Sequence, residues 1–395
     1  MTDFKNLMGI FSIPRPNGSQ AEQKTSHLIQ SWLRDRGIPY QMHTFNHYPY
    51  FFECIGIFLV LSRFMLALAV WLRWGWIALL IAVLGLLGAT FDQAFHIPLV
   101  TWPGRKRGEN VLVQFGPEDP NRELFFTAHY DSKTELLDHR QRMFFLKSLP
   151  AGIAMTVLLG LLGPLDAWLL AQESDWAALT YWTGVALSLP LLFLALGLGL
   201  NMALGRLVRP SSGAVDNGAA CAILLGLAEH LQAGQIPIEN TRLTLALFTG
   251  EEVNLQGSRA YCRSRNFPLP GAALNLEVMA QDGEYVYWEL DGSVFKLVPT
   301  SEQVNRLLKE VVREVAGEEP VPGGPVISDG ASFISQGVPT GVLGTYHSVM
   351  RDGGFHRPTD NLSRVDWSRL PQSVNLLALF LHKYDQGPII RNKNG

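Results

Sequence analysis

Long apolar blocks interrupt an otherwise ordinary alternation of apolar and polar positions along this chain. Four stretches are almost entirely apolar and occur in two pairs, at residues 51–72 and 74–91, and at residues 149–170 and 176–202. Each is close to the roughly 20 apolar residues that a helix needs to cross a bilayer. A short turn joins the members of each pair, around Arg73 in the first and at residues 172–175 in the second. The pattern predicts two transmembrane helical hairpins.

The charges inside these blocks are few. Residues 74–91 and 176–202 carry none, whereas the first block contains Glu53 and Arg63, and the third contains Asp166 beside Pro164. The alternative is a pair of buried core hairpins in a soluble protein. Core helices are seldom this long and this apolar on every face, which favours the membrane interpretation.

The remaining chain has the pattern of an α/β protein. Amphipathic helices are predicted at residues 19–36, 214–232, 255–263, 301–316 and 367–384, and strands at 40–45, 110–115, 123–128, 243–249, 272–278 and 339–343. Apolar strands that alternate with helices predict a mainly parallel mixed sheet flanked by helices. The expected fold is therefore an α/β fold interrupted by the two hairpins.

The expected domain boundaries follow from the same pattern. The globular domain is assembled from residues 1–48, 101–142 and 206–395, with transmembrane hairpins at residues 49–100 and 143–205. Because each insertion contains two helices, the chain returns each time to the side of the membrane that it left. A split domain can therefore close on one face.

Composition agrees with this division and excludes several other classes. Apolar residues make up 47% of the chain and charged residues 17%, which suits a globular part joined to membrane segments. The net charge of −3, without a basic stripe that contains aromatic residues, predicts no nucleic-acid partner. Cys54, Cys221 and Cys262 form no C-x-x-C pair, so neither a disulfide framework nor a thiolate zinc site is expected.

Ionisable side chains follow almost every predicted strand of the globular part. They are His129 and Asp131, then Asp216 in a glycine-rich loop, then Glu251 and Glu252, then Glu277, and finally His356 in a late loop with Asp360. The reactive groups of parallel α/β sheets gather at the carboxyl ends of the strands. These side chains are therefore expected to converge.

Two histidines with several carboxylates are the ligand set of a hydrolytic zinc centre. A lone aspartate such as Asp216 can approach two metal ions at once. Asp131 can lie behind a metal-bound imidazole of His129 as a hydrogen-bond acceptor. Each residue alone has an ordinary structural explanation; paired glutamates, for example, also favour the start of a helix. Their joint occurrence at successive strand ends is what indicates an active site.

The same residues lie in stretches that resemble the two-zinc aminopeptidases of family M28. The matching stretches are IPRPNGSQAE, TAHYDS, SSGAVDNGAACAILLGLAEHL, LALFTGEEVNLQGSRAY, NLE, SDGASFISQGVPTG and FHRPTDNLSRVD, in the order of the family. This resemblance implies a zinc-exopeptidase fold of the phosphorylase/hydrolase-like type and two Zn²⁺ ions per chain. The substrate it implies is a short peptide cleaved at a terminal bond.

Residue roles are implied by the resemblance as well. His129 and Glu277 are expected to bind one zinc ion, Glu252 and His356 the second, and Asp216 both. Glu251 is the expected general base, and Asp131 is expected to orient His129.

Three positions depart from the family pattern. Glu277 stands where the family often has Asp, and its longer side chain suggests a looser first metal site. The SDH motif reads Ser328, Asp329, Gly330 here. His347 is an alternative to His356 as the last ligand, but Pro358, Asp360 and Val365 follow His356 in the family's order.

Other functions stay open. The string HYDSK at residues 129–133 and the pair Asp360–Asn361 look somewhat like the glutaminyl cyclases, single-zinc acyltransferases of the same scaffold. A complete first site at His129 and Glu277 favours the peptidase over these. A catalytically inactive scaffold would need ligand losses, and a transporter would need a paired intramembrane charge system. Aminopeptidase and carboxypeptidase action are not distinguished, although the acidic site favours a free amine.

The expected localisation is that of a multi-pass integral membrane protein, with the lipid bilayer and a peptide substrate as partners. Basic residues flank the hairpins on the side of the globular domain: Arg105, Lys106, Arg107, Arg140, Arg142, Arg206 and Arg209. The opposite turns hold Arg73 against Glu173 and Asp175. This bias predicts a catalytic domain on the cytoplasmic face. Oligomeric state is not indicated.

Overall fold

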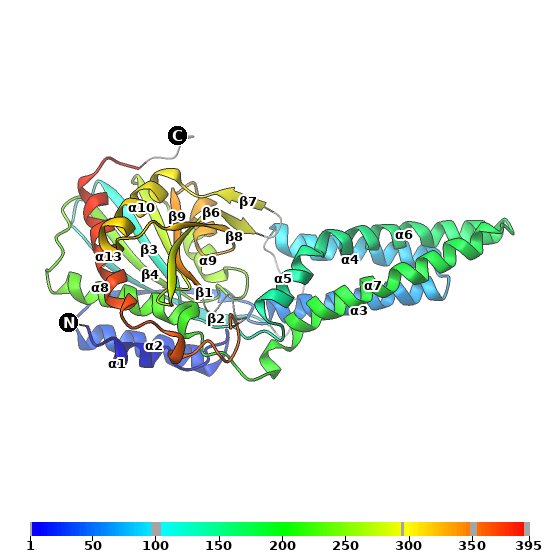
Figure 1. Cartoon of the computed structure of the whole chain (residues 1–395), viewed down its shortest axis with the longest axis horizontal. Helices are drawn as coiled ribbons and strands as arrows, with labels where there is room; N and C mark the ends of the chain where they lie inside the picture. Colours follow the sequence, from blue (N-terminus) through cyan, green and yellow to red (C-terminus); the bar gives the residue numbers. More distant parts are fainter. Residues whose placement is uncertain (1, 96–103, 294–295, 348–353, 391–395) are drawn as a thin grey trace. The chain divides into compact units, whose positions relative to one another are not determined.

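The computed structural model describes residues 2–95, 104–293, 296–347 and 354–390 (Figure 1). The chain divides into two compact units. The first, which we call the sheet unit, contains Met1–Pro49, Arg105–Thr134 and Arg209–Gly395. The second, the helical unit, contains Tyr50–Gly104 and Glu135–Val208. Each unit is described by itself.

A mixed sheet is the core of the first unit. Over the described residues it has nine strands: β1 (Tyr40–His47), β2 (Lys106–Phe115), β3 (Arg122–His129), β4 (Thr241–Phe248), β5 (Gly271–Glu277), β6 (Gly283–Ser293), β7 (Lys296–Pro299), β8 (Val321–Val326) and β9 (Thr340–His347). Their order is β1-β2-β4-β3-β5-β9-β6-β7, with β8 paired to β6. The four central strands β4, β3, β5 and β9 run parallel, and the outer pairs β1–β2, β2–β4, β9–β6 and β6–β7 are antiparallel.

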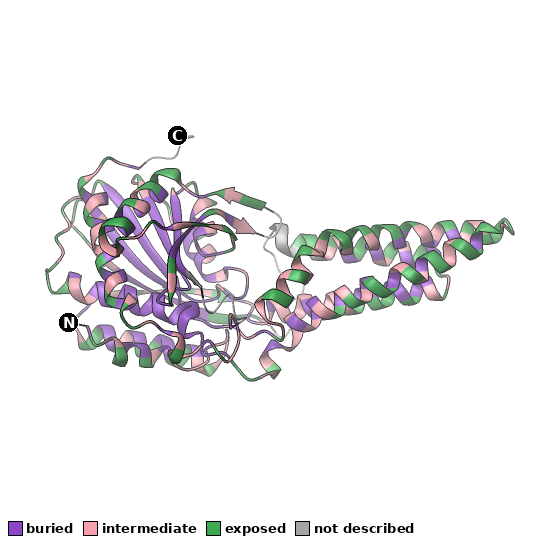
Figure 2. Ribbon diagram, viewed as in Figure 1, coloured by how far each residue is buried: buried purple, intermediate pink, exposed green. Residues whose placement is uncertain are grey.

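Strand β3 shows why the centre of the sheet needs helices on both faces. All eight of its residues are buried. Leu124 and Phe126 pack into the larger hydrophobic core, whereas Phe125 between them packs into the smaller one on the opposite face. Successive side chains of a strand point to opposite faces, so a continuous apolar run such as LFF requires cover on both sides. Figure 2 shows the central strands as buried along their length.

The two hydrophobic cores assign the helices to the two faces. The larger core takes residues from α1 (Phe4–Ile10), α2 (Gln20–Asp35), α8 (Ala219–Gln232), α10 (Glu302–Ala316) and α13 (Arg369–Gln386). The smaller core takes residues from α9 (Gln256–Ser264) and α11 (Gly330–Ile334). The fold is thus the α/β mixed sheet flanked by helices that the sequence predicts.

Two parts of the sheet unit differ from the expectations. Strands β6, β7 and β8 were not predicted, and β8 has the sequence VPGGPV, in which two prolines and two glycines hide the strand pattern. The helix expected from residue 214 begins as α8 at Ala219. Residues Ala214–Gly218 form an irregular turn in which Asp216 and Asn217 have non-helical backbone angles, and the peptide bond between these two is cis.

The helical unit contains α3 (Phe51–Trp71), α4 (Gly75–Phe95), α5 (His139–Lys147), α6 (Leu149–Ala171) and α7 (Trp176–Leu204). Three helical stretches in the described residues are long and apolar enough to cross a membrane: Phe51–Trp71, Leu149–Ala171 and Trp176–Leu207. The apolar stretch of α4, Gly75–Gly88, is shorter than these three. The hairpin predicted to end at residue 100 includes residues 96–100, which lie outside the described part of the chain.

Small residues form the contacts between the helices of this unit. A Cβ atom on Gly56 of α3 would lie 2.4 Å from the carbonyl oxygen of Gly199 in α7. A Cβ atom on Gly75 of α4 would lie 2.3 Å from the carbonyl oxygen of Gly163 in α6. Leu66, Leu159 and Leu191 also pack in the interior, as part of a small buried apolar core. Many other large apolar side chains are exposed, and Figure 2 shows exposed residues along the outer surface of each long helix. The interior of this unit therefore combines close glycine contacts with a small apolar core, and its exterior carries many large apolar side chains.

Candidate metal centre

The parallel register of β3, β4 and β5 brings four of the expected site residues together. His129 is the last residue of β3 and pairs with Phe248, the last residue of β4. Glu251 and Glu252 follow β4 after two residues, and Glu277 ends β5, the other neighbour of β3. Because these strands run in the same direction, their carboxyl ends meet at one edge of the sheet.

Two loops supply the remaining candidates. Asp216 lies in the irregular turn before α8, and His356 lies in the loop after β9 with a positive φ of 57°. Each Asp216 carboxylate oxygen faces a different histidine. Oδ1 lies 3.3 Å from Nε2 of His129, and Oδ2 lies 3.0 Å from Nε2 of His356. Asp216 therefore stands between the two imidazoles.

The side chains form overlapping clusters whose nitrogen and oxygen atoms lie within 4.8 Å of one another. His129, Asp216 and Glu277 make one cluster, and Asp216, Glu252 and His356 make another. His129 with Glu251 and Glu252 makes a third. The first two share Asp216, and their members are all buried.

The buried oxygens indicate that a cation fits this site. Within the part of the chain that the structure describes, Asp216 Oδ2 and Glu252 Oε1 are buried and make no hydrogen bond. Both point toward the ring of His356, at 3.0 and 3.1 Å from Nε2. Two buried carboxylate oxygens that share one imidazole nitrogen and make no hydrogen bond are costly, and coordination of a metal ion is one of the arrangements that compensates them. Imidazole with carboxylate suits a divalent ion such as Zn²⁺.

The pKa shifts of His129 and Asp216 also indicate that the site favours a cation. Burial disfavours the charged form of His129, but the carboxylates of Glu251, Asp131, Asp216 and Glu277 outweigh it and raise the pKa of this histidine well above its usual value. Burial also opposes ionisation of Asp216, yet its contacts with the two histidines lower its pKa. The cluster of carboxylates therefore favours positive charge at its centre, which a proton or a metal ion can supply.

Glu251 differs from the other carboxylates in its exposure. Its side chain is 12% exposed, and Oε2 lies 3.9 Å from Nε2 of His129. Burial raises the pKa of Glu251 well above its usual value; His129 opposes this rise, and Glu252 and Glu277 add to it. A carboxylate with a raised pKa beside a metal cluster has the property required of a general base that later returns its proton as an acid.

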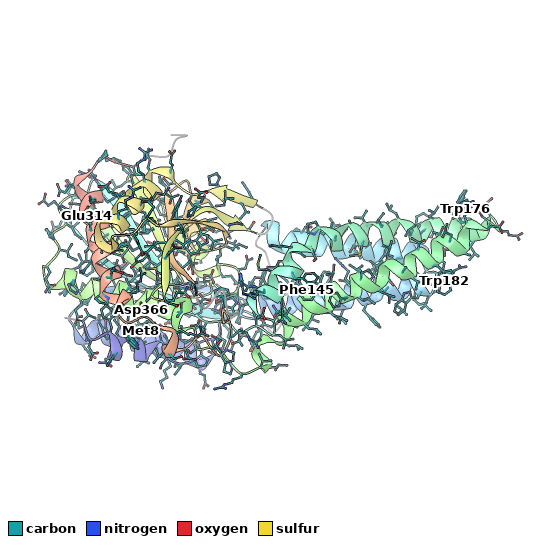
Figure 3. The ribbon with its side chains drawn as sticks, in the orientation of Figure 1. Met8, Phe145, Trp176, Trp182, Glu314 and Asp366 are labelled. Atoms are coloured by element: carbon teal, nitrogen blue, oxygen red, sulfur yellow. The ribbon has the colours of Figure 1, made fainter. Side chains whose placement is uncertain are left out.

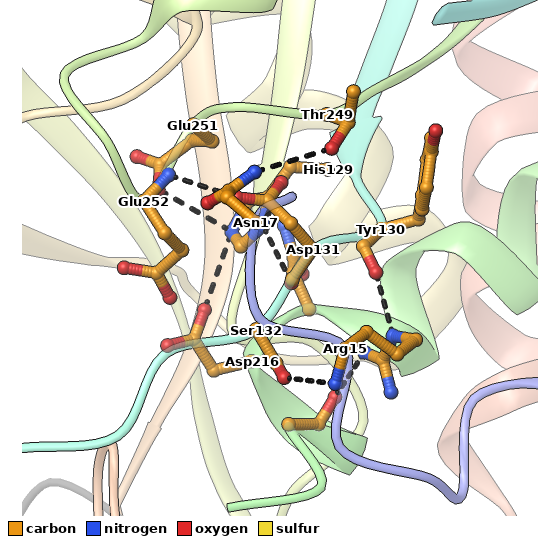
Figure 4. A network of polar contacts seen from close by, with 12 residues as sticks. Arg15, Asn17, His129, Tyr130, Asp131, Ser132, Asp216, Thr249, Glu251 and Glu252 are labelled. Atoms are coloured by element: carbon orange, nitrogen blue, oxygen red, sulfur yellow. Dashed lines mark hydrogen bonds and ion pairs between the residues drawn. The ribbon is translucent and has the colours of Figure 1, made fainter. Parts of the chain in front are cut away.

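Asp131 lies behind His129, as expected. Nδ1 of His129 is 3.3 Å from the backbone oxygen of Asp131 and 3.5 Å from its Oδ1. The second carboxylate oxygen of Asp131 accepts the backbone N–H of Glu252 at 3.0 Å. Asp131 thus favours the tautomer of His129 with the proton on Nδ1, which leaves Nε2 for the cluster, and also holds the Glu252 loop (Figure 4).

Two asparagines that the sequence analysis did not single out hold Glu277. Nδ2 of Asn275 donates to Oε1 of Glu277 at 2.8 Å, and Nδ2 of Asn217 approaches Oε2 at 3.3 Å. Asn275 is in turn fixed by Thr127, whose hydroxyl donates to Oδ1 at 2.6 Å. A glutamate tied by two amides is well positioned, so the longer side chain does not leave this side of the site loose. Spacing by two along a strand places residues on one face, and this signal could have identified Asn275.

The Ser328–Gly330 segment is shaped by a buried aspartate from β6. Oδ1 and Oδ2 of Asp291 accept the backbone N–H and the hydroxyl of Ser328 at 3.0 and 2.7 Å. A Cβ atom on Gly330 would lie 2.7 Å from Oδ2 of Asp291. Gly330 therefore fits a space that Asp291 already limits. Burial raises the pKa of the neighbouring Asp329 to about 8.

His347, the alternative ligand, ends β9, and the placement of its side chain lies outside the described part of the structure. His356 is the histidine that the structure brings to Asp216 and Glu252.

Comparisons with known proteins agree with the fold. Residues 201–381 match the family model of Peptidase family M28. No curated protein matches the sequence. Among solved structures, the aminopeptidase from Aneurinibacillus sp. strain AM-1 is similar with a TM-score of 0.56 at 13% identity, covering 98% of this chain and 96% of that chain.

Two further structures have the same fold. The zinc aminopeptidase BSAP from Bacillus subtilis gives a TM-score of 0.54 at 12% identity, with 96% of this chain and 94% of that chain covered. The Fimbriiglobus ruber glutaminyl cyclase gives 0.55 at 14% identity, with 97% and 93% covered. The chain thus has the zinc-exopeptidase fold, its region 201–381 matches a metallopeptidase family, and its structural neighbours include both aminopeptidases and glutaminyl cyclases.

Proposed function

We propose that this chain is a two-metal aminopeptidase that removes the N-terminal residue of short peptides. The observation that carries the proposal is the position of Asp216 between two complete clusters, each with one histidine and one glutamate of its own. One carboxylate shared by two ion sites is the arrangement that paired hydrolytic metals require. In this proposal His129 and Glu277 hold one ion, Glu252 and His356 hold the other, and Asp216 holds both.

The protein's own groups have separate tasks. Bound divalent ions of this kind supply a polarised carbonyl and a water of lowered pKa. Glu251, the most exposed of these carboxylates, accepts the proton of the attacking water and donates it to the departing amine. Asp131 keeps His129 in one tautomer and orientation throughout. The surplus of carboxylates favours a substrate that presents a free amine.

A glutaminyl cyclase is the second candidate, because several structural neighbours carry that name. Cyclases of this scaffold are expected to use a single zinc ion at the counterparts of Asp216, Glu252 and His356. The complete cluster at His129 and Glu277 supports the peptidase instead.

One experiment separates these candidates. Zinc is counted per chain in the purified protein, and the protein is assayed on free, N-acetylated and C-amidated dipeptides and on a peptide with N-terminal Gln, with and without chelator. The proposal expects two zinc ions and chelator-sensitive release of the first residue, which N-acetylation blocks. One zinc ion together with cyclisation of the Gln peptide would overturn it in favour of the cyclase. Cleavage of acetylated dipeptides with blocking by C-amidation would indicate a carboxypeptidase.

We propose also that the helical unit is embedded in a lipid bilayer. Many of its large apolar side chains are exposed, while several of its helix contacts bring glycines of two helices close together. Without a hydrophobic force between them, membrane helices associate through small residues that allow close approach. Trp76 and Trp176 lie at the starts of α4 and α7, beside the hairpin turns, and Trp182 follows within α7; they are 72, 66 and 64% exposed. Figure 3 shows Trp176 and Trp182 toward one end of the helical unit. Membrane proteins enrich tryptophan at the ends of their spans, where the bilayer meets water.

Arg73, Asp166 and Trp71 in the helical unit each have a polar partner. Nε of Arg73 lies 3.5 Å from Oδ2 of Asp166, and its guanidinium lies over the ring of Tyr181. The indole N–H of Trp71 donates to the hydroxyl of Ser188 at 2.9 Å. Ionisable residues in membrane segments are tolerated when they face the bundle interior and pair, so these contacts are compatible with a lipid surround.

Fractionation and labelling test the location. The protein is expected to stay in the membrane fraction after an alkaline carbonate wash. With the catalytic unit in the cytoplasm, a cysteine introduced by Asp175→Cys in the turn before α7 is expected to react with an impermeant maleimide in intact cells, and one introduced by Ser363→Cys only after lysis. Release by carbonate contradicts the membrane proposal, and the inverse labelling pattern contradicts the sidedness.

A further inference from the structure

Arg15 is a completely buried arginine whose hydrogen bonds go to main-chain carbonyls. It lies between α1 and α2, and its exposed fraction is zero. Its guanidinium donates to carbonyl oxygens of its own segment, Phe11 at 2.6 Å and Ile13 at 2.9 Å. It also donates to carbonyl oxygens far away in the sequence, namely Tyr130 at 2.5 Å, Ser212 at 2.5 Å and Gly213 at 3.0 Å. The planar guanidinium of arginine has five N–H donors, and no other side chain can donate to carbonyl oxygens in so many directions.

The distant carbonyls belong to the two loops that carry central metal-ligand candidates. We call residues 129–132 the His loop and residues 211–216 the Asp loop. Tyr130 follows His129 directly, whereas Ser212 and Gly213 precede Asp216. The backbone of Arg15 adds two bonds to the His loop: its N–H donates to the Ser132 hydroxyl at 2.8 Å, and its carbonyl accepts the Ser132 N–H at 3.1 Å. Figure 4 shows Arg15 with its partners in the His loop.

The Asp loop has a shape that fits around this guanidinium. Gly213 has a φ of +60°, in the left-handed region that favours glycine. A Cβ atom at this position would lie 2.5 Å from the carbonyl oxygen of Asp216 and 2.7 Å from Cβ of Ser132. Both contacts are too short, and Nη2 of Arg15 would lie 3.3 Å away. The Asp loop thus makes a tight turn at Gly213, next to the Arg15 guanidinium. This turn sets the position of the Asp216 backbone, from which the carboxylate extends.

Charge connects Arg15 to the metal centre rather than to an ion pair. Burial lowers the pKa of Arg15, and Cys221, followed by the carboxylates of Asp360, Asp131 and Asp216, opposes this effect. A buried cation is costly unless it is compensated. Here the compensating carboxylates are those that surround the candidate metal site, so the guanidinium and the site depend on each other.

We propose that Arg15 is a positioning residue for the metal centre: it fixes the His loop against the Asp loop, and so sets the spacing of His129 and Asp216 on which metal affinity depends. The inference rests on the proposed function only in assuming that this site binds a divalent metal. His129 Nε2 and Asp216 Oδ1 lie 3.3 Å apart. Residues behind the ligands typically change metal affinity by about 10- to 100-fold when they are replaced.

Arg122 offers a matched control. It is also a buried arginine that donates to main-chain carbonyls, those of Tyr384 at 3.0 Å and Gly387 at 2.8 Å. Arg122 begins β3 and His129 ends it, so the two residues lie at opposite ends of that strand. Arg15→Lys and Arg122→Lys each keep the positive charge and lose the planar guanidinium with its several N–H donors. Both are expected to lower the melting temperature of the full-length protein in detergent.

Metal affinity distinguishes the two variants. Zn²⁺ is titrated against a chromogenic chelator, and Co²⁺ spectra report the ligand geometry without any turnover. Arg15→Lys is expected to bind at least one zinc equivalent about 10-fold or more weakly and to alter the Co²⁺ spectrum. Arg122→Lys is expected to stay within about twofold of the wild type, because its partners are remote from the ligands.

The milder Ser132→Ala variant removes only the hydroxyl that accepts the Arg15 N–H and keeps the test decisive if Arg15→Lys does not fold. It is expected to weaken zinc binding in the same direction. Unchanged affinity in the variants of Arg15 and Ser132 that fold, or equal weakening in Arg122→Lys, overturns the positioning role. Absence of zinc binding by the wild type would instead overturn the proposed function, so the two failures are distinguishable.

Discussion

Asp360 holds the backbone of Asp216: its Oδ2 accepts the Asp216 N–H at 3.1 Å, and its Oδ1 accepts the preceding N–H of Val215 at 2.8 Å. Asp360 therefore acts on the shared carboxylate of the candidate site without touching the metal positions itself. It lies four residues after His356, so one short loop supplies a ligand candidate and an anchor for another.

Replacement of this anchor should weaken metal binding. We expect Asp360→Ala to lower zinc affinity about 10- to 100-fold, measured by chelator competition, because the Asp216 backbone is no longer fixed. Asp385→Ala is the control, since the Asp385 carboxylate likewise accepts two successive backbone N–H groups, of Glu239 and Asn240. Both changes should reduce the melting temperature, but only the first should reduce zinc affinity. Equal zinc affinities in the two variants would argue against the anchor.

Replacement of the proposed base, Glu251, should lower turnover without lowering zinc content. Glu251→Gln should keep the wild-type zinc content and lower kcat by about 10²- to 10⁴-fold, because a neutral amide cannot accept the proton of the attacking water. Glu252→Gln provides the contrast and should lose zinc, since Glu252 Oε1 lies in the second cluster. Metal analysis and peptide hydrolysis are measured on the same preparations. Wild-type turnover by Glu251→Gln would place the base elsewhere.

Much of the candidate site was predictable from the sequence because its residues stand at strand ends. His129, Glu252 and Glu277 follow or end β3, β4 and β5, and the parallel register brings those ends together whatever the details of packing. The apolar runs that predict these strands are short and buried on both faces, and their length, rather than their periodicity, distinguishes them from helices.

The supporting residues were less predictable for a physical reason. Arg15 donates to backbone carbonyls, which every residue has. The sequence therefore contains no acidic residue type that would identify its partners. Asp291 reaches Ser328 from β6, a strand that was not predicted. The helix expected from residue 214 begins later, because the backbone N–H groups of Val215 and Asp216 donate to Asp360, a residue far along the chain.

Asn275 allows the two proposed ion sites to be told apart. It touches Glu277, which belongs only to the cluster of His129, so Asn275→Ala should weaken one of two zinc equivalents about 10-fold and spare the other. Stepwise calorimetric titration would resolve the two equivalents. Asn305→Ala is the control: it removes another buried amide, which donates to the Thr300 hydroxyl far from the clusters, and it should spare both equivalents. Parallel weakening of both equivalents by Asn275→Ala would contradict the assignment.

Glu22 gives a prediction about pH. It is buried, and burial raises its pKa to about 7 although it accepts hydrogen bonds from Thr249, Gly18 and Asn17. The folded state thus retains a proton that the unfolded state releases near pH 4.5. Between these values the folded state binds more protons, so this group's contribution to stability decreases as pH rises, by at most about 1.4 kcal/mol per pH unit.

Glu22→Gln removes that titration. The melting temperature of the wild type should therefore fall relative to Glu22→Gln between about pH 5 and pH 8, measured in the same detergent. Glu118→Gln makes the same change at an exposed position and should run parallel to the wild type. A constant difference between wild type and Glu22→Gln over this range would show that Glu22 does not titrate there.

Packing through glycine in the helical unit can be tested with one substitution at two positions of α6. A side chain on Gly163 would meet the carbonyl oxygen of Gly75 at 2.7 Å and Cβ of Ala78 at 3.0 Å, so Gly163→Leu must push α4 and α6 apart. At Gly152 the nearest atom would be Cδ1 of Leu194 at 3.9 Å, which is ordinary contact. Gly163→Leu should lower the melting temperature in detergent. Gly152→Leu should leave it unchanged or raise it, because leucine favours helix over glycine by roughly 0.5–1 kcal/mol. Equal effects at both positions would mean that α4 and α6 do not pack through the Gly75–Gly163 contact.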